Sequence, residues 1–242
     1  MMKMTNNTVL ITGGTSGIGL ALAERFLSLG NEVIICGRNE ANLRAVKAKH
    51  PQVHIRVSDT GKESDRIALW AWATATFPQL NVLINNAGIQ RKVDLSQSEP
   101  WSDTDQEIAI NLGGPIHLSR IAIPHLLKQE RPAIMNVSSG LAFVPLTAAP
   151  VYSATKAAIH SFTLSLRYQL RNTPIQVTEI IPPAVRTNLG GSHDFGVPLD
   201  EYADSVMKQI EESRPETTYQ LSAQTSQASR AEVDQIFKRM NP

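Results

Sequence analysis

Residues 8–19 read Thr-Val-Leu-Ile-Thr-Gly-Gly-Thr-Ser-Gly-Ile-Gly, a β-branched apolar run followed by a turn rich in glycine. From Leu20 to Gly30 the apolar residues recur at helical spacing, and a glycine ends the pattern. The stretch therefore predicts a strand, a tight turn and a helix. Glycine lets the backbone approach a pyrophosphate, and a helix N-terminus offers N–H groups to the anion. The order Gly-x-x-x-Gly-x-Gly differs from the usual Gly-x-Gly-x-x-Gly fingerprint, so a turn that needs glycine only for its shape is the alternative.

The same alternation of strand and helix continues along the chain. Further strands are expected at 31–36, 53–57, 81–84, 132–137 and 175–181, and further helices at 40–49, 62–77, 101–128 (interrupted at 111–115) and 151–171. Such alternation predicts an α/β fold with a doubly wound parallel sheet and helices on both faces. Beyond 198 we expect a last strand at 216–221, a mobile segment at 222–229 and a final helix at 231–240.

Composition favours one domain spanning residues 1–242. The chain is 42% hydrophobic and carries a formal net charge of +1, with acids and bases mixed, which predicts neither nucleic acid nor anionic lipid as a partner. It shows no secretory signal and no membrane span, so we expect a cytoplasmic protein. Cys36 stands alone in an apolar run and is expected to be a buried thiol. The six histidines show no metal-ligand spacing, and no metal is predicted.

The second expected strand is followed by Gly37-Arg38-Asn39, with no acidic residue. At this point a Rossmann-type fold places an acid for the ribose hydroxyls of NAD, or an arginine for a 2′-phosphate. The planar guanidinium suits phosphate. Arg38 therefore predicts a preference for NADP(H), with NAD(H) not excluded; a helix cap is its alternative role.

Tyr152 and Lys156 lie four residues apart in a stretch that begins with Pro150, a residue suited to the first turn of a helix. They are expected to share one helical face. The pKa of a free tyrosine is about 10, so a tyrosine that acts as a base near neutral pH must have its pKa lowered by roughly 3. An adjacent ammonium group provides part of that effect. A surface tyrosine beside a solvated lysine is the alternative.

Two further polar sites complete the pattern. Asn85-Asn86-Ala87-Gly88 ends the fourth strand, where open α/β sheets bind ligands. Asn111 interrupts a long helical pattern, which predicts either a local kink that holds a water molecule or a satisfied polar turn.

Taken together, these motifs, Asn136-Val137-Ser138-Ser139 and Pro182-Pro183-x-Val185-x-Thr187 resemble the short-chain dehydrogenase/reductase family in its compact single-domain form. The resemblance covers about 9–187 and implies a Rossmann-like sheet of about seven strands. Within the family, the chain resembles a little-characterised DltE-like branch of bacterial oxidoreductases, sometimes linked to cell-wall D-alanylation.

The resemblance also implies roles for individual residues. Tyr152 would be the general acid/base, Lys156 would lower its pKa and hold the nicotinamide ribose, Ser139 would bind the substrate carbonyl, and Asn111 would anchor a water molecule. The implied cofactor contacts are Thr12, Gly13, Ser16, Gly17, Ile18 and Gly19 at the phosphates, Arg38 at the 2′-phosphate, Asp59 at the adenine, Asn85, Ala87 and Gly88 on the ribose side, and Val185 and Thr187 at the carboxamide.

The substrate side is less defined. Candidate pocket residues are Ile89, Gln90, Arg91, Leu141, Ala142, Phe143, Val144 and Leu189, and they include no carboxylate clamp. A lid is expected near 188–200, where glycines provide hinges, although a simple loop fits equally well. Pro183 replaces the glycine usual in the family and removes one N–H near the nicotinamide. We expect a homodimer through the helices that carry Asn111 and Tyr152, with a tetramer as a further possibility.

The function predicted is an NADP(H)-dependent oxidoreductase acting on a small ketone or secondary alcohol. Two alternatives are an epimerase or isomerase that retains its nicotinamide and a non-enzymatic NADP(H)-binding sensor or scaffold. The glycine spacing and the short C-terminal region argue against the first, and the complete set Asn111, Ser139, Tyr152 and Lys156 argues against the second.

Overall fold

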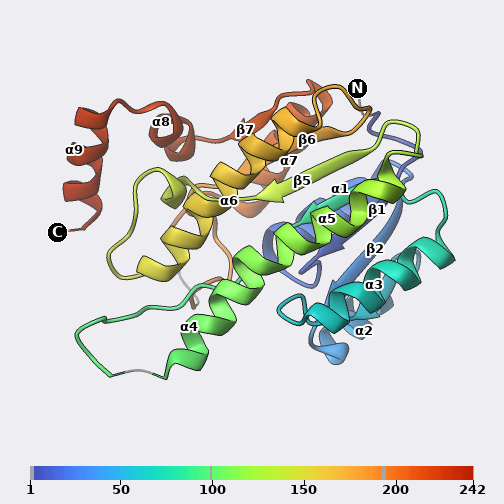
Figure 1. Cartoon of the computed structure of the whole chain (residues 1–242), viewed down its shortest axis with the longest axis horizontal. Coiled ribbons are helices and arrows are strands. Elements are labelled where there is room, and N and C mark those ends of the chain that lie inside the picture. The colour runs from blue at the N-terminus through green and yellow to red at the C-terminus, as the bar shows by residue number, and fades with distance from the viewer. Residues whose placement is uncertain (1–2, 99, 192–194, 242) are drawn as a thin grey trace.

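A computed structural model describes residues 3–98, 100–191 and 195–241 and arranges them on one sheet of seven parallel strands (Figure 1). The order across the sheet is β3-β2-β1-β4-β5-β6-β7. The strands are β1 (Thr8–Thr12), β2 (Glu32–Gly37), β3 (His54–Val57), β4 (Val82–Asn85), β5 (Ala133–Val137), β6 (Gln176–Ile181) and β7 (Glu216–Thr218). The predicted doubly wound fold is confirmed.

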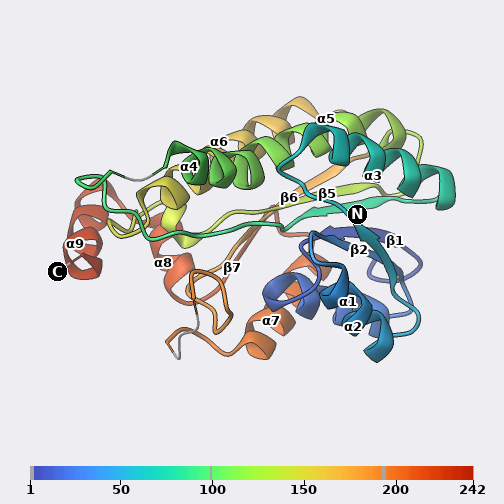
Figure 2. The ribbon, with the colours of Figure 1, turned by 90° about the horizontal axis from the view of Figure 1, so that it is seen from below.

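Helices cover both faces of the sheet (Figure 2). On one face lie α1 (Gly17–Ser28), α2 (Glu40–Lys49) and α7 (Leu199–Glu211); on the other lie α3 (Glu63–Thr76), α4 (Trp101–Ile108), α5 (Gly114–Leu126) and α6 (Pro150–Gln169). Each face has its own buried apolar cluster. In β1, Val9 and Ile11 belong to one cluster and Leu10 to the other, so both sides of the strand are buried. This explains why the strands appear in the sequence as continuous apolar runs.

The turn between β1 and α1 needs its glycines. Gly13 has a φ of +67°, and a Cβ there would lie 2.9 Å from the Cα of Ala87. A Cβ at Gly19 would lie 2.3 Å from the Asn86 side-chain nitrogen. The turn therefore packs directly on the loop that follows β4, which a larger residue at either position would prevent.

The long helical pattern at 101–128 is interrupted, as predicted. Between α4 and α5 the chain forms a π-helical turn, η1 (Ala109–Gly113), which contains Asn111. Such turns widen a helix locally and reorient one side chain. Pro115 lies directly after this turn, in the first turn of α5, and has no N–H to donate to the preceding helical turn.

The C-terminal region differs from the expectation. Strand β7 confirms part of the predicted last strand, but the segment 222–229, expected to be mobile, contains most of helix α8 (Leu221–Gln227). Ser222 is fully buried and its hydroxyl donates to the Ile181 carbonyl oxygen at 2.7 Å, so a contact distant in sequence orders the segment. Helix α9 (Arg230–Met240) follows, and Ser229 and Glu232 form a capping box at its N-terminus.

Residues 192–194, at the centre of the predicted lid, lie outside the described residues. On one side of them, a Cβ at Gly190 would lie 3.3 Å from the Gln90 side chain. On the other side, Val197 pairs with the segment 184–186, and α7 begins at Leu199. The segment 188–191 is thus placed beside the loop that follows β4.

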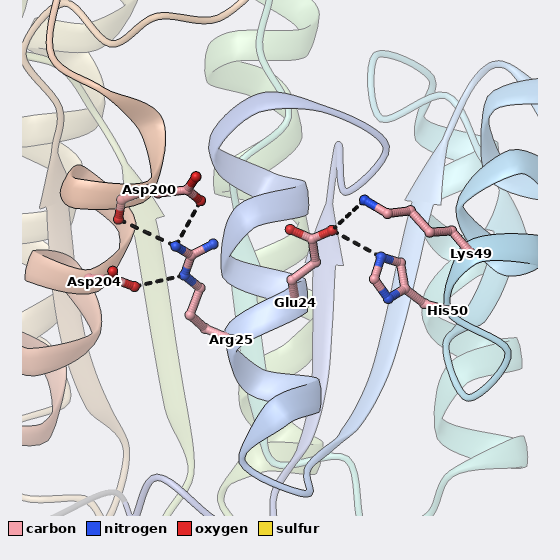
Figure 3. A network of polar contacts seen from close by, with 6 residues as sticks. All are labelled: Glu24, Arg25, Lys49, His50, Asp200 and Asp204. Atoms are coloured by element: carbon pink, nitrogen blue, oxygen red, sulfur yellow. Dashed lines mark hydrogen bonds and ion pairs between the residues drawn. The ribbon is translucent and has the colours of Figure 1, made fainter.

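Polar contacts connect α1 to its two neighbours (Figure 3). Arg25 pairs with Asp200 and Asp204 of α7, each at 2.9 Å. On the other side, Glu24 accepts from Lys49 at 3.3 Å and pairs with His50 at 2.9 Å. The helix that begins at the glycine turn is therefore anchored on both flanks.

Two smaller predictions concern Cys36 and the membrane. Cys36 is buried, as predicted, and burial raises the pKa of its thiol to about 12. Across the described ranges, no helix combines the length and the apolar character needed to cross a bilayer.

Candidate active site

Four polar residues from three parts of the fold meet beyond the carboxyl ends of β4 and β5. Ser139 follows β5 and precedes the short helix η2 (Gly140–Ala142), Tyr152 and Lys156 lie on α6, and Asn111 lies in η1. All four are at most 7% exposed. The structure thus brings together the set that the sequence predicted as catalytic.

Tyr152 has a protonated phenol in this environment. Burial raises the pKa of Tyr152 to about 12; its hydrogen bond with the Ser139 side chain lowers the pKa, and the charge of Glu107 raises it further. The sequence predicts a lowered pKa, and this expectation is wrong for the structure described, because burial outweighs the stabilising contacts. The neighbouring Ser138 hydroxyl has no partner among the described residues, so only Ser139 engages the tyrosine.

Lys156 is buried against the same residue. Its Nζ lies 5.5 Å from the centroid of the Tyr152 ring and donates to the Val137 carbonyl oxygen at 2.7 Å. Burial lowers the pKa of Lys156 to about 8, and attraction to Glu179 opposes the decrease. The lysine therefore carries its charge at neutral pH at an energetic cost.

Asn111 fixes the loop that follows β4. Its Nδ2 donates to the Ile89 carbonyl oxygen at 2.8 Å, and its Oδ1 accepts from the Ile89 N–H at 2.9 Å. The same Nδ2 lies 3.3 Å from the Thr155 hydroxyl. The π-helical turn thus directs the Asn111 side-chain amide toward Ile89, which lies in an irregular segment with no sheet partner. Gly88 lies beside both Asn111 and Lys156.

The glycine turn has the properties of an anion site. Ser16 precedes α1 without capping it through its side chain, and the first turn of α1 contains no acid. The Thr12 hydroxyl accepts from the N–H groups of Asn86 and Ala87, each at 3.0 Å. The N-terminus of a twelve-residue helix therefore faces the loop after β4 with no carboxylate to repel a phosphate. Ile18, in the first turn of α1, packs against the buried cluster that contains Val9 and Ile11.

Other predicted cofactor residues have varied surroundings. Arg38 is exposed at the end of β2, and within the described chain no hydrogen bond or ion pair involves its side chain. Asp59 Oδ1 accepts from the Gly61 N–H at 3.0 Å. A Cβ at Gly17 would lie 3.3 Å from the Thr187 methyl group, so these two predicted contacts are adjacent. Val185 packs into the core instead of presenting its side chain to a ligand.

Asn85 differs from the expectation that it contacts the ribose side. Its side chain is 2% exposed and donates to Asn136 Oδ1 at 2.8 Å and to the Ser119 hydroxyl at 3.1 Å. It lies beneath α5 on a covered face of the sheet. Its role in the structure is therefore to join β4, β5 and α5.

The candidate substrate residues divide into two groups. Arg91 donates to the Asp103 carbonyl oxygen and to Gln106 Oε1, both at 2.7 Å, so its guanidinium is bound to α4. Leu141 and Phe143 follow Ser139. Leu189 lies in the segment 188–191 and is 36% exposed. Leu141, Phe143 and Leu189 thus remain candidates, whereas Val144 is fully buried and Arg91 has a structural role.

Glu107 is a site residue that the sequence analysis missed. It is fully buried in α4, one turn before Asn111, and its Oε1 accepts from the Arg91 N–H at 3.3 Å. Oε2 has no partner in the described part of the chain. Burial raises the pKa of Glu107. Its four-residue spacing from Asn111 is the one sequence signal that indicated a shared face.

A strand, a glycine turn that suits a phosphate and a buried Ser-Tyr-Lys-Asn set at the switch point of a parallel sheet define a Rossmann-type dehydrogenase fold. A family model for short chain dehydrogenases matches residues 7–194. The chain is 48% identical over 249 aligned residues to the uncharacterized oxidoreductase DltE of Bacillus subtilis, covering 99% of this chain and 98% of that protein.

Solved structures agree in fold. A short-chain dehydrogenase from Sphingobium yanoikuyae in complex with NADPH superposes with a TM-score of 0.81 at 24% identity, covering 96% of this chain and 93% of the other. One from Burkholderia phymatum in complex with NAD gives 0.83 at 24% identity, covering 100% and 98%. The chain belongs to the short-chain dehydrogenase family, in its DltE-like branch, and is an oxidoreductase of that family.

Proposed function

We propose that the protein is an NADP(H)-dependent reductase or dehydrogenase that acts on a small ketone or secondary alcohol, with Tyr152 as its general acid/base. The observation that supports this most strongly is the shared burial of Ser139, Tyr152 and Lys156, with the Lys156 ammonium 5.5 Å from the centroid of the Tyr152 ring. A proton donor, a second hydroxyl and a buried positive charge then act on one substrate oxygen.

The residues of the chain divide the proton chemistry among them. Ser139 orients the substrate oxygen, and Tyr152, whose pKa of about 12 keeps it protonated, donates its phenolic proton to the developing alkoxide. Lys156 stabilises the phenolate that remains, and Asn111 holds the Ile89 backbone at the edge of the site. A bound nicotinamide would supply or accept the hydride, which is the chemistry of the cofactor itself. In the alcohol-to-ketone direction the same groups act in reverse.

Arg38 is the basis for the NADP(H) preference. It is an exposed guanidinium at the end of β2, free of bonds to the described residues, at the position where an acid would select NAD. Its charge and planar donors suit a 2′-phosphate. Relatives in fold have been solved with NADPH and with NAD, so fold similarity alone does not decide the preference.

Cofactor titration tests this part of the proposal. We expect the purified protein to bind NADPH at least about tenfold more tightly than NADH, the effect of one charge-assisted phosphate contact. Arg38→Asp should abolish or invert that ratio. Arg44→Asp on α2, also exposed, is the control and should preserve it. Equal affinities for the two cofactors in the wild-type protein would leave Arg38 as a helix cap and remove the NADP(H) preference.

Turnover tests the chemistry. With a panel of small ketones and NADPH, we expect Tyr152→Phe to reduce kcat by about a hundredfold or more, because it removes the proton donor and leaves the cavity shape unchanged. The exposed Tyr168→Phe on the same helix should have no effect. Tight NADPH binding together with an absence of turnover across the panel would favour the sensor alternative instead.

A further inference from the structure

A row of polar side chains crosses four strands of the sheet in register. Asn85 pairs with Asn136, Asn136 with Glu179, and Glu179 with Glu216. Each member contacts a helix of the same face: Asn85 contacts Ser119 of α5, while the other three contact Thr163, His160 and Arg167 of α6. Two of the four are acids, and buried acids require hydrogen bonds and a nearby positive charge.

Glu179 is the more deeply buried of the two acids. It is fully buried in β6, and its Oε2 lies 2.9 Å from His160 Nδ1. Its Oε1 has no hydrogen-bond partner in the described part of the chain. His160 follows Lys156 by one turn of α6, so both side chains point from the helix toward the same part of the sheet. Attraction between Glu179 and Lys156 opposes the effect of burial on the lysine.

Glu216 has a counter-ion of its own. Its Oε1 lies 3.6 Å from Arg167 Nη1, and its side chain is 34% exposed. One potential ligand atom each from His160, Glu179 and Glu216 lies within 4.8 Å of the other two. Arg167 already pairs with Glu216, however, and Lys156 attracts Glu179, and these two positive charges disfavour a divalent cation. The arrangement is better described as an Arg167–Glu216 ion pair beside a His160–Glu179 hydrogen bond.

We propose that Glu179, held in place by His160, is the buried counter-ion of Lys156 and sets the pH range over which this lysine remains an ammonium ion. Glu179 and His160 are positioning residues, because both act through Lys156. The catalytic meaning of the proposal rests on the proposed function. The ionisable groups that face the pair are Tyr152, Lys156 and Arg167 from α6 and Glu216 from β7. Glu107 of α4 acts on Tyr152.

His160 gives the pair a connection to solvent. Its side chain is 23% exposed, while Glu179 is fully covered. The His160 ring also packs edge-on against the ring of Phe143, with the two ring centroids 4.6 Å apart. Phe143 belongs to the segment that follows Ser139. His160 therefore links the buried carboxylate to the surface beside the active site.

The test is the titration of Lys156 itself, followed by NMR of protein with ¹³C-labelled lysine and without any cofactor or substrate. The Lys156 signal is assigned by its loss in Lys156→Arg. We expect Glu179→Gln, which keeps the shape and removes the charge, to reduce the proton affinity of Lys156 about tenfold or more. Glu216→Gln is the matched control on the neighbouring strand. Glu216→Gln should change the proton affinity of Lys156 far less, because Arg167 balances the charge of Glu216.

The histidine is tested by two substitutions. His160→Asn keeps a donor near the position of Nδ1 and should leave the Lys156 titration close to that of the wild type. His160→Leu removes the donor, so Glu179 should take up a proton and the lysine should titrate as in Glu179→Gln. This second variant provides the measurement if Glu179→Gln does not fold.

A Lys156 titration that Glu179→Gln moves no more than Glu216→Gln does would overturn the proposal. The NMR experiment requires no turnover, so its outcome is independent of the substrate and of the proposed reaction. If activity is found, its pH profile should move with the Lys156 titration in Glu179→Gln and His160→Leu and remain in place in His160→Asn.

Discussion

At Lys156 the requirements of stability and of the site oppose each other. Lys156 is 4% exposed, and its ammonium donates to the Val137 carbonyl oxygen at 2.7 Å. Burial lowers its pKa from 10.5 to about 8, so below about pH 8 the folded protein carries a buried charge that the unfolded chain exposes to water. The residue therefore destabilises the free protein at neutral pH.

The sign of this effect predicts a pH dependence. Between about pH 8 and 10.5 the unfolded chain holds a proton that the folded protein has released, so stability rises with pH. Relative to Lys156→Met, the free energy of unfolding of the wild type should increase by about 2 to 3 kcal/mol from about pH 7 to about pH 10. Urea unfolding at a series of pH values measures it.

A substitution of an exposed lysine provides the control for that series. Lys62 lies outside the core, so Lys62→Met should leave the difference from the wild type independent of pH over the same window. A constant difference between wild type and Lys156→Met would contradict the lowered pKa of Lys156.

The sequence predicted the grouping of site residues better than their energetics. Four-residue spacing placed Tyr152 and Lys156 on one face of a helix, and the structure agrees. The direction of the Tyr152 pKa was wrong, because it depends on burial by segments distant in sequence. Glu107 and Glu179 were missed for a related reason: the partners of a buried acid are not visible until strand register and helix packing are known.

At the scale of elements, local signals predicted most of the chain. β-Branched runs marked the strands, and Asn111 marked the π-helical turn that separates α4 from α5. Helix α8 escaped prediction because its composition is polar and its order comes from Ser222, which bonds the end of β6. Likewise, the contacts of Arg25 with α7 join residues about 175 positions apart, which no local pattern reveals (Figure 3).

At the scale of the whole molecule, the two faces of the sheet differ in what remains uncovered. Around α4 and α6, Leu95 is 75% exposed, Trp101 69% and Tyr168 67%. A groove of about 490 Å³ between α4, the segment before it and α6 is lined mainly by apolar side chains, among them Ile108 and Val151. Exposed apolar surface of this kind indicates a site of association.

A second copy of the chain is the partner that fits the expected homodimer. We predict that the protein is a dimer in solution through α4 and α6, and that Trp101→Glu, which places a charge in the apolar surface, shifts it to a monomer without unfolding it. Light scattering coupled to size exclusion measures the mass. Leu29→Glu, at the end of α1 on the opposite face and 40% exposed, should leave the dimer intact.

The position of this surface gives the dimer a link to the site. Thr155 lines the groove, and its hydroxyl lies 3.3 Å from Asn111 Nδ2, so one layer of side chains separates the proposed interface from the residues around Tyr152. If dimerisation orders that layer, Trp101→Glu should also weaken NADPH binding, whereas Leu29→Glu should not. A wild-type monomer, or a Trp101→Glu protein that remains dimeric, would place any interface elsewhere; a tetramer would require a second one, for which the three-residue edge strand β7 is available.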